Sequence, residues 1–312
     1  SPIFHQISMD VKGAESLRFL SFIAAVDALE ALDALGPVTG WDISIDGLRR
    51  LARLLIDDIT SDPLEIKPDT DSELRQIFDF GPVLELPPAR STPDQENSLI
   101  NWLDWVSEDA LASIDSNQEP EDLNKMVPDR DNIDHYLQRV EELLRNIGYG
   151  TLLVNPLSQQ YHTLFRNLIF ATAWQETCWR QYKHRSGKLR PVTSSAGALG
   201  MMQIMPIVWR GFYDTRSLGN DIEYNAAAGG EILHRYLVRY ALRKGEHKQS
   251  GGVDNLARAT YAAYNGGPRH LTRYRKSSTS KSLKKIDAAF WDKFVLTRDN
   301  GALSVRECYP YE

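Results

Sequence analysis

The segment from Ala171 to Trp179 places one carboxyl group among apolar side chains. It reads Ala-Thr-Ala-Trp-Gln-Glu-Thr-Cys-Trp, so Glu176 has Ala173 and Trp174 before it and Trp179 after it. Apolar neighbours disfavour the ionised carboxylate and raise its pKa, which suits a general acid near neutral pH. The same segment taken alone also fits a solvated glutamate near a helix end.

A second segment, residues 194–206, reads Ser-Ser-Ala-Gly-Ala-Leu-Gly-Met-Met-Gln-Ile-Met-Pro. Gly197 and Gly200 permit close backbone approach or unusual dihedral angles. Gln203 carries both a donor and an acceptor for hydroxyl and amide groups, and Pro206 stops a short helix. The pattern favours a glycine-punctuated loop that could form one wall of a ligand groove.

A third segment, residues 261–268, reads Tyr-Ala-Ala-Tyr-Asn-Gly-Gly-Pro. Asn265 and Gly266 suit a helix C-terminus, and Pro268 prevents continuation. This leaves Tyr264 in the last turn, where its hydroxyl either reaches a cleft or packs at the helix end.

These three blocks together resemble the soluble lytic transglycosylase (SLT) family. The resemblance rests on the motifs Glu176-Thr, Ser194-x-x-Gly-Ala-x-Gly-Met-Met-Gln203 and Ala263-Tyr-Asn-Gly-Gly-Pro268. Asn225, Gly229 and Leu233 resemble the family's intervening helix, so the likeness covers roughly residues 155–275. The resemblance implies the helical lysozyme-like fold that the family shares with goose-type lysozymes.

The resemblance also implies a role for each matching residue. Glu176 would be the catalytic acid/base, and Ser194 would lie near the N-acetyl group of the reacting sugar. Met202 and Gln203 would line the groove, and Tyr264 would lie close to the catalytic glutamate. Asn265, from the third block, completes the expected substrate-binding set.

Two kinds of departure from the family pattern concern the site. Thr177 and Met201 replace a serine and a leucine, which are mild changes. The 18 positions between Glu176 and Ser194 are about twice the spacing expected of the family. The extra segment, residues 181–190, is strongly basic. It either extends the groove wall and contacts an anionic strand, which we favour, or is a solvated loop.

The mechanism implied by the family needs a single carboxyl group. No Asp or Glu occurs between Thr177 and Tyr213, although most glycosidases use two carboxylates. Glu176 would protonate the glycosidic oxygen between N-acetylmuramic acid and N-acetylglucosamine, the N-acetyl carbonyl would assist, and the sugar's 6-hydroxyl would close a 1,6-anhydro ring. No metal or cofactor is expected.

Two alternatives remain open from the residues. If Asp214, Asp221 or Glu223 positions a water molecule, the protein would be a hydrolase of the goose-lysozyme kind. The chain could also be a peptidoglycan-binding or assembly protein that keeps the fold without catalysis, although such a role does not need Glu176.

Helices must position these residues, because apolar side chains recur at helical spacing and clear alternating strand patterns are scarce. We expect a mainly α protein, with helices over residues 15–35, 45–59, 73–78, 95–113, 131–147, 157–182, 223–243, 254–265 and 287–296. The polar segment 117–130 is the best boundary candidate. We therefore expect an acidic helical N-terminal region over 1–128, of unknown role, and a lysozyme-like transglycosylase domain over 129–312.

The distribution of charge supports this division. Residues 1–130 hold 10 Lys and Arg against 26 Asp and Glu, a net charge of -16, and the remaining 26 and 16 give residues 131–312 a net charge of +10. A basic half suits an anionic polymer, or is simply a solvated surface. No nucleic-acid motif is recognisable, so we expect peptidoglycan strands as partner. The acidic region either docks a protein partner or shapes one side of the glycan groove.

Location and redox state are only partly constrained by the sequence. The N-terminus SPIFHQIS shows no signal peptide, which fits either a cytoplasmic protein or a mature, processed chain. The family resemblance implies the bacterial cell envelope, most naturally the periplasm. The chain has two cysteines, Cys178 and Cys308. They could form a disulfide, which fits an oxidising compartment, or remain as two buried thiols.

Overall fold

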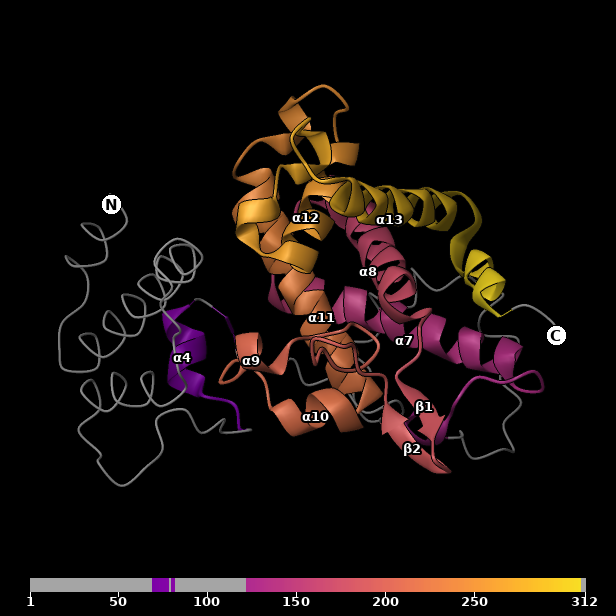
Figure 1. Cartoon of the computed structure of the whole chain (residues 1–312). Helices are drawn as coiled ribbons and strands as arrows, with labels where there is room; N and C mark the ends of the chain where they lie inside the picture. Colours follow the sequence, from indigo (N-terminus) through magenta and orange to yellow (C-terminus); the bar gives the residue numbers. More distant parts are fainter. Residues whose placement is uncertain (1–68, 79, 82–121, 310–312) are drawn as a thin grey trace, which may run out of the picture. The chain divides into compact units, whose positions relative to one another are not determined.

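The computed structural model describes residues 69–78, 80–81 and 122–309. The predicted helices over 15–35, 45–59 and 95–113 lie outside these residues. In the described part, helices dominate and one two-stranded sheet is present, which confirms the mainly α prediction (Figure 1). None of the described helices is long and apolar enough to cross a membrane.

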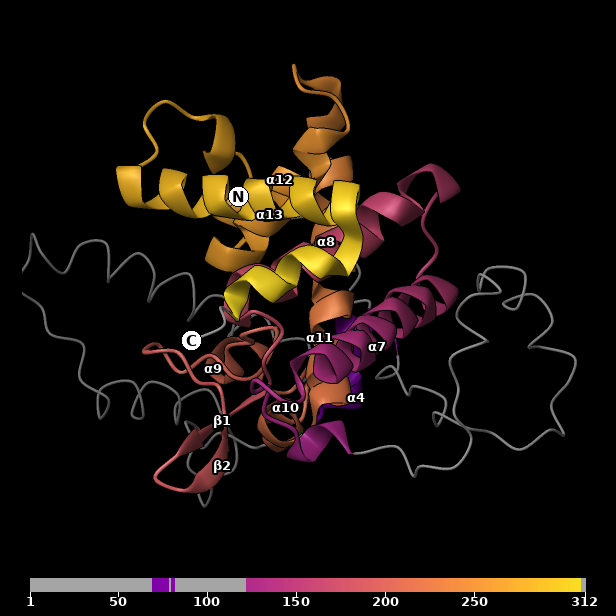
Figure 2. The same ribbon diagram turned by 90° about the vertical axis from the view of Figure 1, so that its right-hand side faces the viewer.

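Helix α8 (His162–Thr177) lies at the centre of the domain. It is buried around almost its whole circumference, and α7 (Ile133–Val154), α11 (Ile222–Arg235), α12 (Asp254–Gly266) and α13 (Lys281–Asn300) all contact it. Figures 1 and 2 show these helices around α8 from two directions. A helix that is apolar on all sides is stable only where neighbours cover every face.

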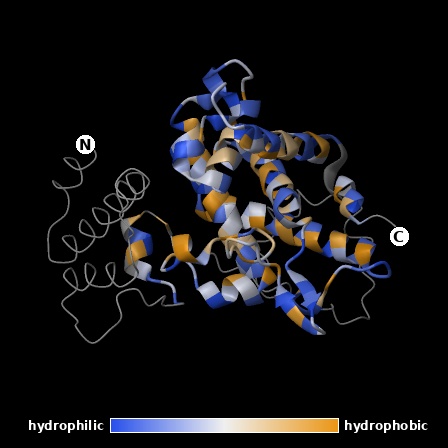
Figure 3. Cartoon of the chain, viewed as in Figure 1, coloured by the Kyte–Doolittle hydropathy of each residue, from blue (hydrophilic) through white to orange (hydrophobic). Residues whose placement is uncertain are grey.

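The outer helices bury only one stripe each. In α7 the buried side chains recur at helical spacing, as in Tyr136, Val140, Leu144 and Ile147. Apolar and polar residues consequently alternate around the helices in Figure 3. This periodicity is what made the helix predictable from the sequence.

Short elements connect the long helices. They are 3-10 turns η1 (Leu123–Lys125), η2 (Gln159–Tyr161), η4 (Glu246–Lys248), η5 (Pro268–His270), η6 (Arg273–Arg275) and η7 (Gly301–Cys308), and helices α9 (Pro206–Trp209) and α10 (Thr215–Asn220). The predicted helix over 223–243 is confirmed as α11 continuing directly into a π-helical stretch, η3 (Tyr236–Leu242). The predicted helices at 254–265 and 287–296 correspond to α12 and α13, the second of which begins earlier than expected.

The helix predicted over 157–182 ends sooner, at Thr177. Cys178 and Trp179 both have left-handed backbone conformations, with φ of 56° and 64°, which no α-helix can continue. The following segment forms an antiparallel hairpin of β1 (Tyr182–Arg185) and β2 (Lys188–Pro191). The sequence marks residues 181–190 as a basic segment and does not predict strands there.

The two cysteines form a disulfide, which settles the alternatives left open by the sequence. The bond joins the end of α8 to the end of η7, 130 positions later. Two further contacts reinforce this junction: Trp174 Nε1 donates to Cys308 Sγ at 3.1 Å, and the Tyr309 hydroxyl donates to the Cys178 carbonyl. The C-terminal end of the described chain is thereby fixed to the helix that carries Glu176.

All the described residues, including 69–78 and 80–81, fall in one compact unit, and the predicted domain boundary at residue 128 stays a prediction. The short predicted helix is present as α4 (Ser72–Ile77), and its Arg75 is almost fully buried. Arg75 pairs with Glu231 of α11 at 2.8 Å, and Tyr213 donates a hydrogen bond to the same carboxylate. Arg75 thus connects α4 to a helix that follows far later in the chain.

Candidate active site

Glu176 lies in the last turn of α8 and is partly buried. Desolvation raises the pKa of its carboxyl group from an ordinary 4.5 to about 7. Trp174 and Thr177, its neighbours on the same helix, are buried, so protein rather than water surrounds much of the carboxyl group. A carboxyl group with this pKa can donate a proton and later accept one near neutral pH.

The hydroxyl group nearest to this carboxylate belongs to Tyr261, which donates to Glu176 Oε1 at 3.0 Å. Tyr261 is itself held in place because its ring stacks on Phe290 of α13, with centroids 3.9 Å apart and planes nearly parallel. This hydrogen bond lowers the pKa of Glu176 against the larger opposing effect of burial, and the charge of Arg273 acts in the same direction.

Sequence reasoning assigned no role to Tyr261 and placed Tyr264 beside the glutamate. The two tyrosines are three positions apart on α12 and therefore share a face, which was the available signal. The hydroxyl of Tyr264 instead donates to the carbonyl of Met202 at 2.6 Å. Tyr264 remains within electrostatic range of Glu176, whose charge contributes to the raised pKa of the tyrosine after burial.

The loop that carries Met201 and Met202 is held by side chains from several elements. Thr177, next to Glu176, donates to the Met201 carbonyl at 2.8 Å. The Met201 amide donates to Gln181 Oε1 at 2.7 Å, and the Met202 amide donates to Asn225 Oδ1 at 2.8 Å. The loop backbone is thus tied to the end of α8, to the base of the hairpin and to α11.

Two glycines make this arrangement sterically possible. Gly200 has φ of 72°, and a Cβ there would lie 2.4 Å from Asn225 Nδ2. A Cβ at Gly229 would lie 2.5 Å from Cγ of Met202. Because real Cβ atoms do not approach so closely, larger residues at either position would displace the loop.

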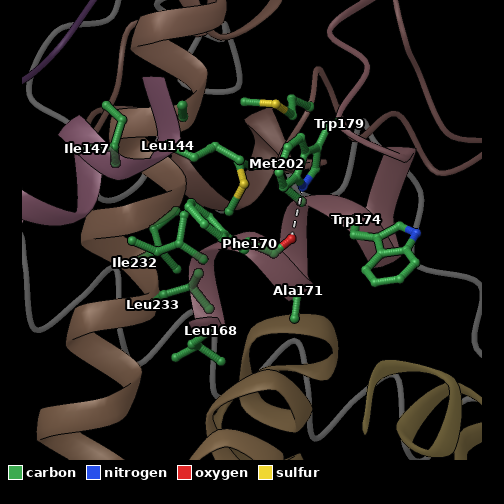
Figure 4. Close-up of a cluster of buried hydrophobic side chains, with 14 of the residues drawn as sticks. Leu144, Ile147, Leu168, Phe170, Ala171, Trp174, Trp179, Met202, Ile232 and Leu233 are labelled. Atoms are coloured by element: carbon green, nitrogen blue, oxygen red, sulfur yellow. Dashed lines mark hydrogen bonds between the residues drawn. The ribbon is translucent and has the colours of Figure 1, made fainter. Parts of the chain in front are cut away.

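The side chain of Met202 is fully buried in the core beside Trp179 and Phe170, as Figure 4 shows. The sequence resemblance had placed Met202 along the groove. In the structure the side chain supports the loop from inside, and its backbone atoms receive the contacts of Tyr264 and Asn225.

The remaining predicted residues lie on the same structural unit. Ser194 Oγ accepts from the Ala198 amide at 3.0 Å and closes the turn before the loop. Gln203, with φ of 49°, donates through Nε2 to the carbonyl of Gly200 at 2.7 Å. In the described part of the chain, no hydrogen bond joins Ser194 or Gln203 directly to Glu176.

Asn265 is exposed at the end of α12, and its Oδ1 accepts from Arg273 Nη2 at 2.9 Å. Arg273 is buried and forms a close ion pair with Asp287 of α13, at 2.7 Å. This network connects Asn265 to Arg273, whose charge lowers the pKa of Glu176.

Two of the carboxylates considered as possible second catalytic groups cap helices. Asp214 accepts from the Ser217 amide at the start of α10, and Asp221 accepts from the amides of Glu223 and Tyr224 at the start of α11. The third, Glu223, is exposed. Among the described residues, no group of three or more His, Cys, Asp or Glu could hold a metal ion.

Comparison with known proteins identifies part of the chain. Residues 153–286 match the family model described as Transglycosylase SLT domain. No curated protein and no solved structure gave a match. The matched range contains Glu176, the loop at 194–206 and the end of α12, so it confirms the resemblance drawn from those three blocks. Residues 153–286 are therefore similar to transglycosylase SLT domains, which act on peptidoglycan in the cell envelope.

Proposed function

We propose that this protein is a lytic transglycosylase that cleaves the β-1,4 bond between N-acetylmuramic acid and N-acetylglucosamine and leaves 1,6-anhydro ends. The observation that carries the proposal is the environment of Glu176. Its pKa of about 7 leaves a substantial protonated fraction at neutral pH, and its one direct hydrogen-bond partner in the described structure is Tyr261. One residue can therefore act first as acid and then as base.

In the proposed reaction, Glu176 gives its proton to the glycosidic oxygen as the bond from that oxygen to C1 of the muramic acid breaks. The carbonyl oxygen of the sugar's own N-acetyl group assists from the opposite side. The 6-hydroxyl oxygen then bonds to C1 and its proton passes to Glu176, which regains its starting state. No water molecule enters the product.

Substrate assistance is favoured over hydrolysis by the roles of the other carboxylates. Asp214 and Asp221 accept backbone hydrogen bonds at helix N-termini, which fixes them in structural positions. A muramidase would need one of them, or Glu223, to position water. The same geometry disfavours a purely binding role, because burying a carboxyl group without a direct ion pair has a cost that catalysis explains.

We further propose that Ser194, Gln203, Tyr264 and Asn265 surround the sugar rings, with Met202 supporting them from below. The protein would act in the periplasm, where peptidoglycan is accessible and a disulfide such as Cys178–Cys308 persists. The proposed chemistry requires no cofactor.

The deciding experiment is digestion of purified peptidoglycan by the wild type and Glu176→Gln, with mass spectrometry of the soluble products. We expect anhydro-muropeptides from the wild type and a rate loss of about a thousandfold or more in the variant. Glu142→Gln, the same change at an exposed position of α7, is the matched control and should retain full activity.

The other outcomes identify the rival functions. Products with ordinary reducing ends would show a hydrolase and overturn the transglycosylase proposal. A folded wild-type protein that binds glycan but releases no product would show a binding or assembly protein.

A further inference from the structure

The β1–β2 hairpin has an unusual arrangement of charge. Its register pairs Lys183 with Arg190 and Arg185 with Lys188 across the two strands. Residues two apart on a strand, and residues directly opposite each other, lie on the same side of a sheet. All four cations therefore share one face of the hairpin, which we call the cationic face.

Nothing in the described structure neutralises this face. The hairpin contains no acidic residue, and none of the four cations forms an ion pair with a described residue. Arg185, Lys188 and Arg190 are exposed, and the hairpin is strongly hydrophilic in Figure 3. Like charges directly opposite each other destabilise a strand pair. The hairpin thus carries a feature that opposes its own folding.

The hairpin is nevertheless firmly attached. Tyr182, at its start, is buried, and its hydroxyl donates to Asn124 Oδ1 at 2.9 Å. The turn at Ser186 and Gly187 has φ of 51° and 70°, which matches the twist of a tight hairpin. A rigid hairpin with opposed cations is better explained by an anionic partner than by a flexible, solvated loop.

The base of the hairpin belongs to the same hydrogen-bonded structure as the site loop. Val192, the residue after β2, donates to the Gln181 carbonyl at 2.8 Å. The carbonyl of Val192 accepts from the Gly200 amide at 2.9 Å and from Gln203 Nε2 at 3.3 Å. The cationic face is therefore held next to the loop that carries the proposed sugar-binding residues, and Figures 1 and 2 show the strands projecting beyond the helices.

We propose that the cationic face binds the carboxylates of the peptidoglycan strand, those of its stem peptides and of any lactyl groups that carry no peptide, beyond the sugars held at Glu176. This inference rests on the proposed function, since it extends the same substrate across an adjoining surface. It makes the hairpin a specificity element that distinguishes anionic peptidoglycan from a neutral β-1,4 glycan such as chitin. The face presents no aromatic side chain, so it lacks the stacking platform typical of single-stranded nucleic-acid binding.

The test is the double variant Lys188→Glu with Arg190→Glu. These changes place a carboxylate opposite Arg185 and Lys183, so each like-charged pair becomes an attractive pair. The thermal midpoint should stay equal to or rise above that of the wild type. Binding to insoluble peptidoglycan, measured by sedimentation at about 0.1 M salt, should fall by about tenfold or more. If the four cations served only the stability of the hairpin, the thermal midpoint and the binding to peptidoglycan would change in the same direction.

The matched control is Lys244→Glu with Lys285→Glu, which reverses two exposed charges elsewhere in the described chain. It should bind peptidoglycan within about twofold of the wild type, which is a small free-energy difference. If the hairpin variant and this control bind equally well, the cationic face is not the binding surface. If the thermal midpoint and the binding of the hairpin variant fall together, the four cations serve the fold, and the proposal is overturned. Binding to single-stranded DNA is measured in parallel. A hairpin variant that loses binding to DNA but still binds peptidoglycan as the wild type does would also overturn the proposal.

Two further measurements separate this proposal from the proposed function. Binding of a soluble chitin oligosaccharide should be equal in the wild type and the hairpin variant, because that ligand carries no carboxylate. The hairpin variant should still release anhydro products from peptidoglycan, at a reduced rate. If the wild type releases no anhydro product, the proposed function fails, whereas anhydro products with unchanged peptidoglycan binding in the hairpin variant refute only the role of the hairpin.

Discussion

Two glutamates on neighbouring central helices show how the same side chain serves opposite purposes. Glu231 of α11 is buried with a full set of partners: Arg75 contacts both carboxylate oxygens, and Tyr213 donates a further hydrogen bond. Among the described residues, the carboxyl group of Glu176 on α8 accepts a single hydrogen bond, from Tyr261. The cation that lowers its pKa, Arg273, forms its ion pair with Asp287 instead. A paired buried carboxylate stabilises the fold, whereas an unpaired one becomes available for proton transfer.

The largest expected effect on stability comes from Glu231→Gln. The change breaks the buried ion pair between Glu231 and Arg75, so we expect a loss of about 3 kcal/mol in the free energy of unfolding. Urea denaturation of the variant and wild type measures the difference. Activity per folded molecule should stay close to that of the wild type, and a specific loss of turnover at full stability would reverse the roles assigned to the two glutamates.

Glu176→Gln should have the opposite effect, and only at higher pH. The folded pKa of about 7 lies above the ordinary 4.5, so the wild-type protein progressively loses stability as pH rises from about 4.5 through 7 and the buried carboxyl group ionises. We expect the variant to be more stable than the wild type by about 2 kcal/mol at pH 8 and equal to it at pH 4. Equal stability at both pH values would mean that Glu176 is not desolvated.

Tyr261→Phe tests the smaller contribution to the pKa of Glu176. The tyrosine hydrogen bond favours the ionised carboxylate, so its removal should raise the pKa of Glu176. The high-pH limb of kcat/KM, where the protonated acid is lost, should therefore move upward by about half a pH unit. Tyr264→Phe is the matched control, because its hydroxyl donates to Met202 and the limb should stay in place. A shift of equal size in both variants would show that the tyrosines act through general packing.

Much of this arrangement is predictable from local sequence. Apolar spacing revealed the helices around α8. Three short blocks located Glu176, the glycine loop and the end of α12, all within the matched range. These features depend on residues close together in the chain, where periodicity and turn preferences are informative.

The features that escaped prediction depend on long-range partners. Arg75 lies 156 positions from Glu231, and nothing in the sequence around α4 shows that its cation completes a buried pair. The hairpin was missed because Lys and Arg occupy half of its strand positions, so no apolar alternation marked the strands. Tyr261 was overlooked beside the more familiar Tyr264, although their helical spacing placed both hydroxyls on the side facing α8 and the loop.

The disulfide between Cys178 and Cys308 also determines the order in which the protein can be completed. A ribosome makes Cys178 first, and the 130-residue separation means that most of the hairpin, loop and helices α9 to α13 must be made before its partner exists. The left-handed turn that ends the helix of Glu176 is therefore locked only after the elements that surround the site have been synthesised, and only where thiols can be oxidised. The bond can therefore form only after every element between the two cysteines has been synthesised.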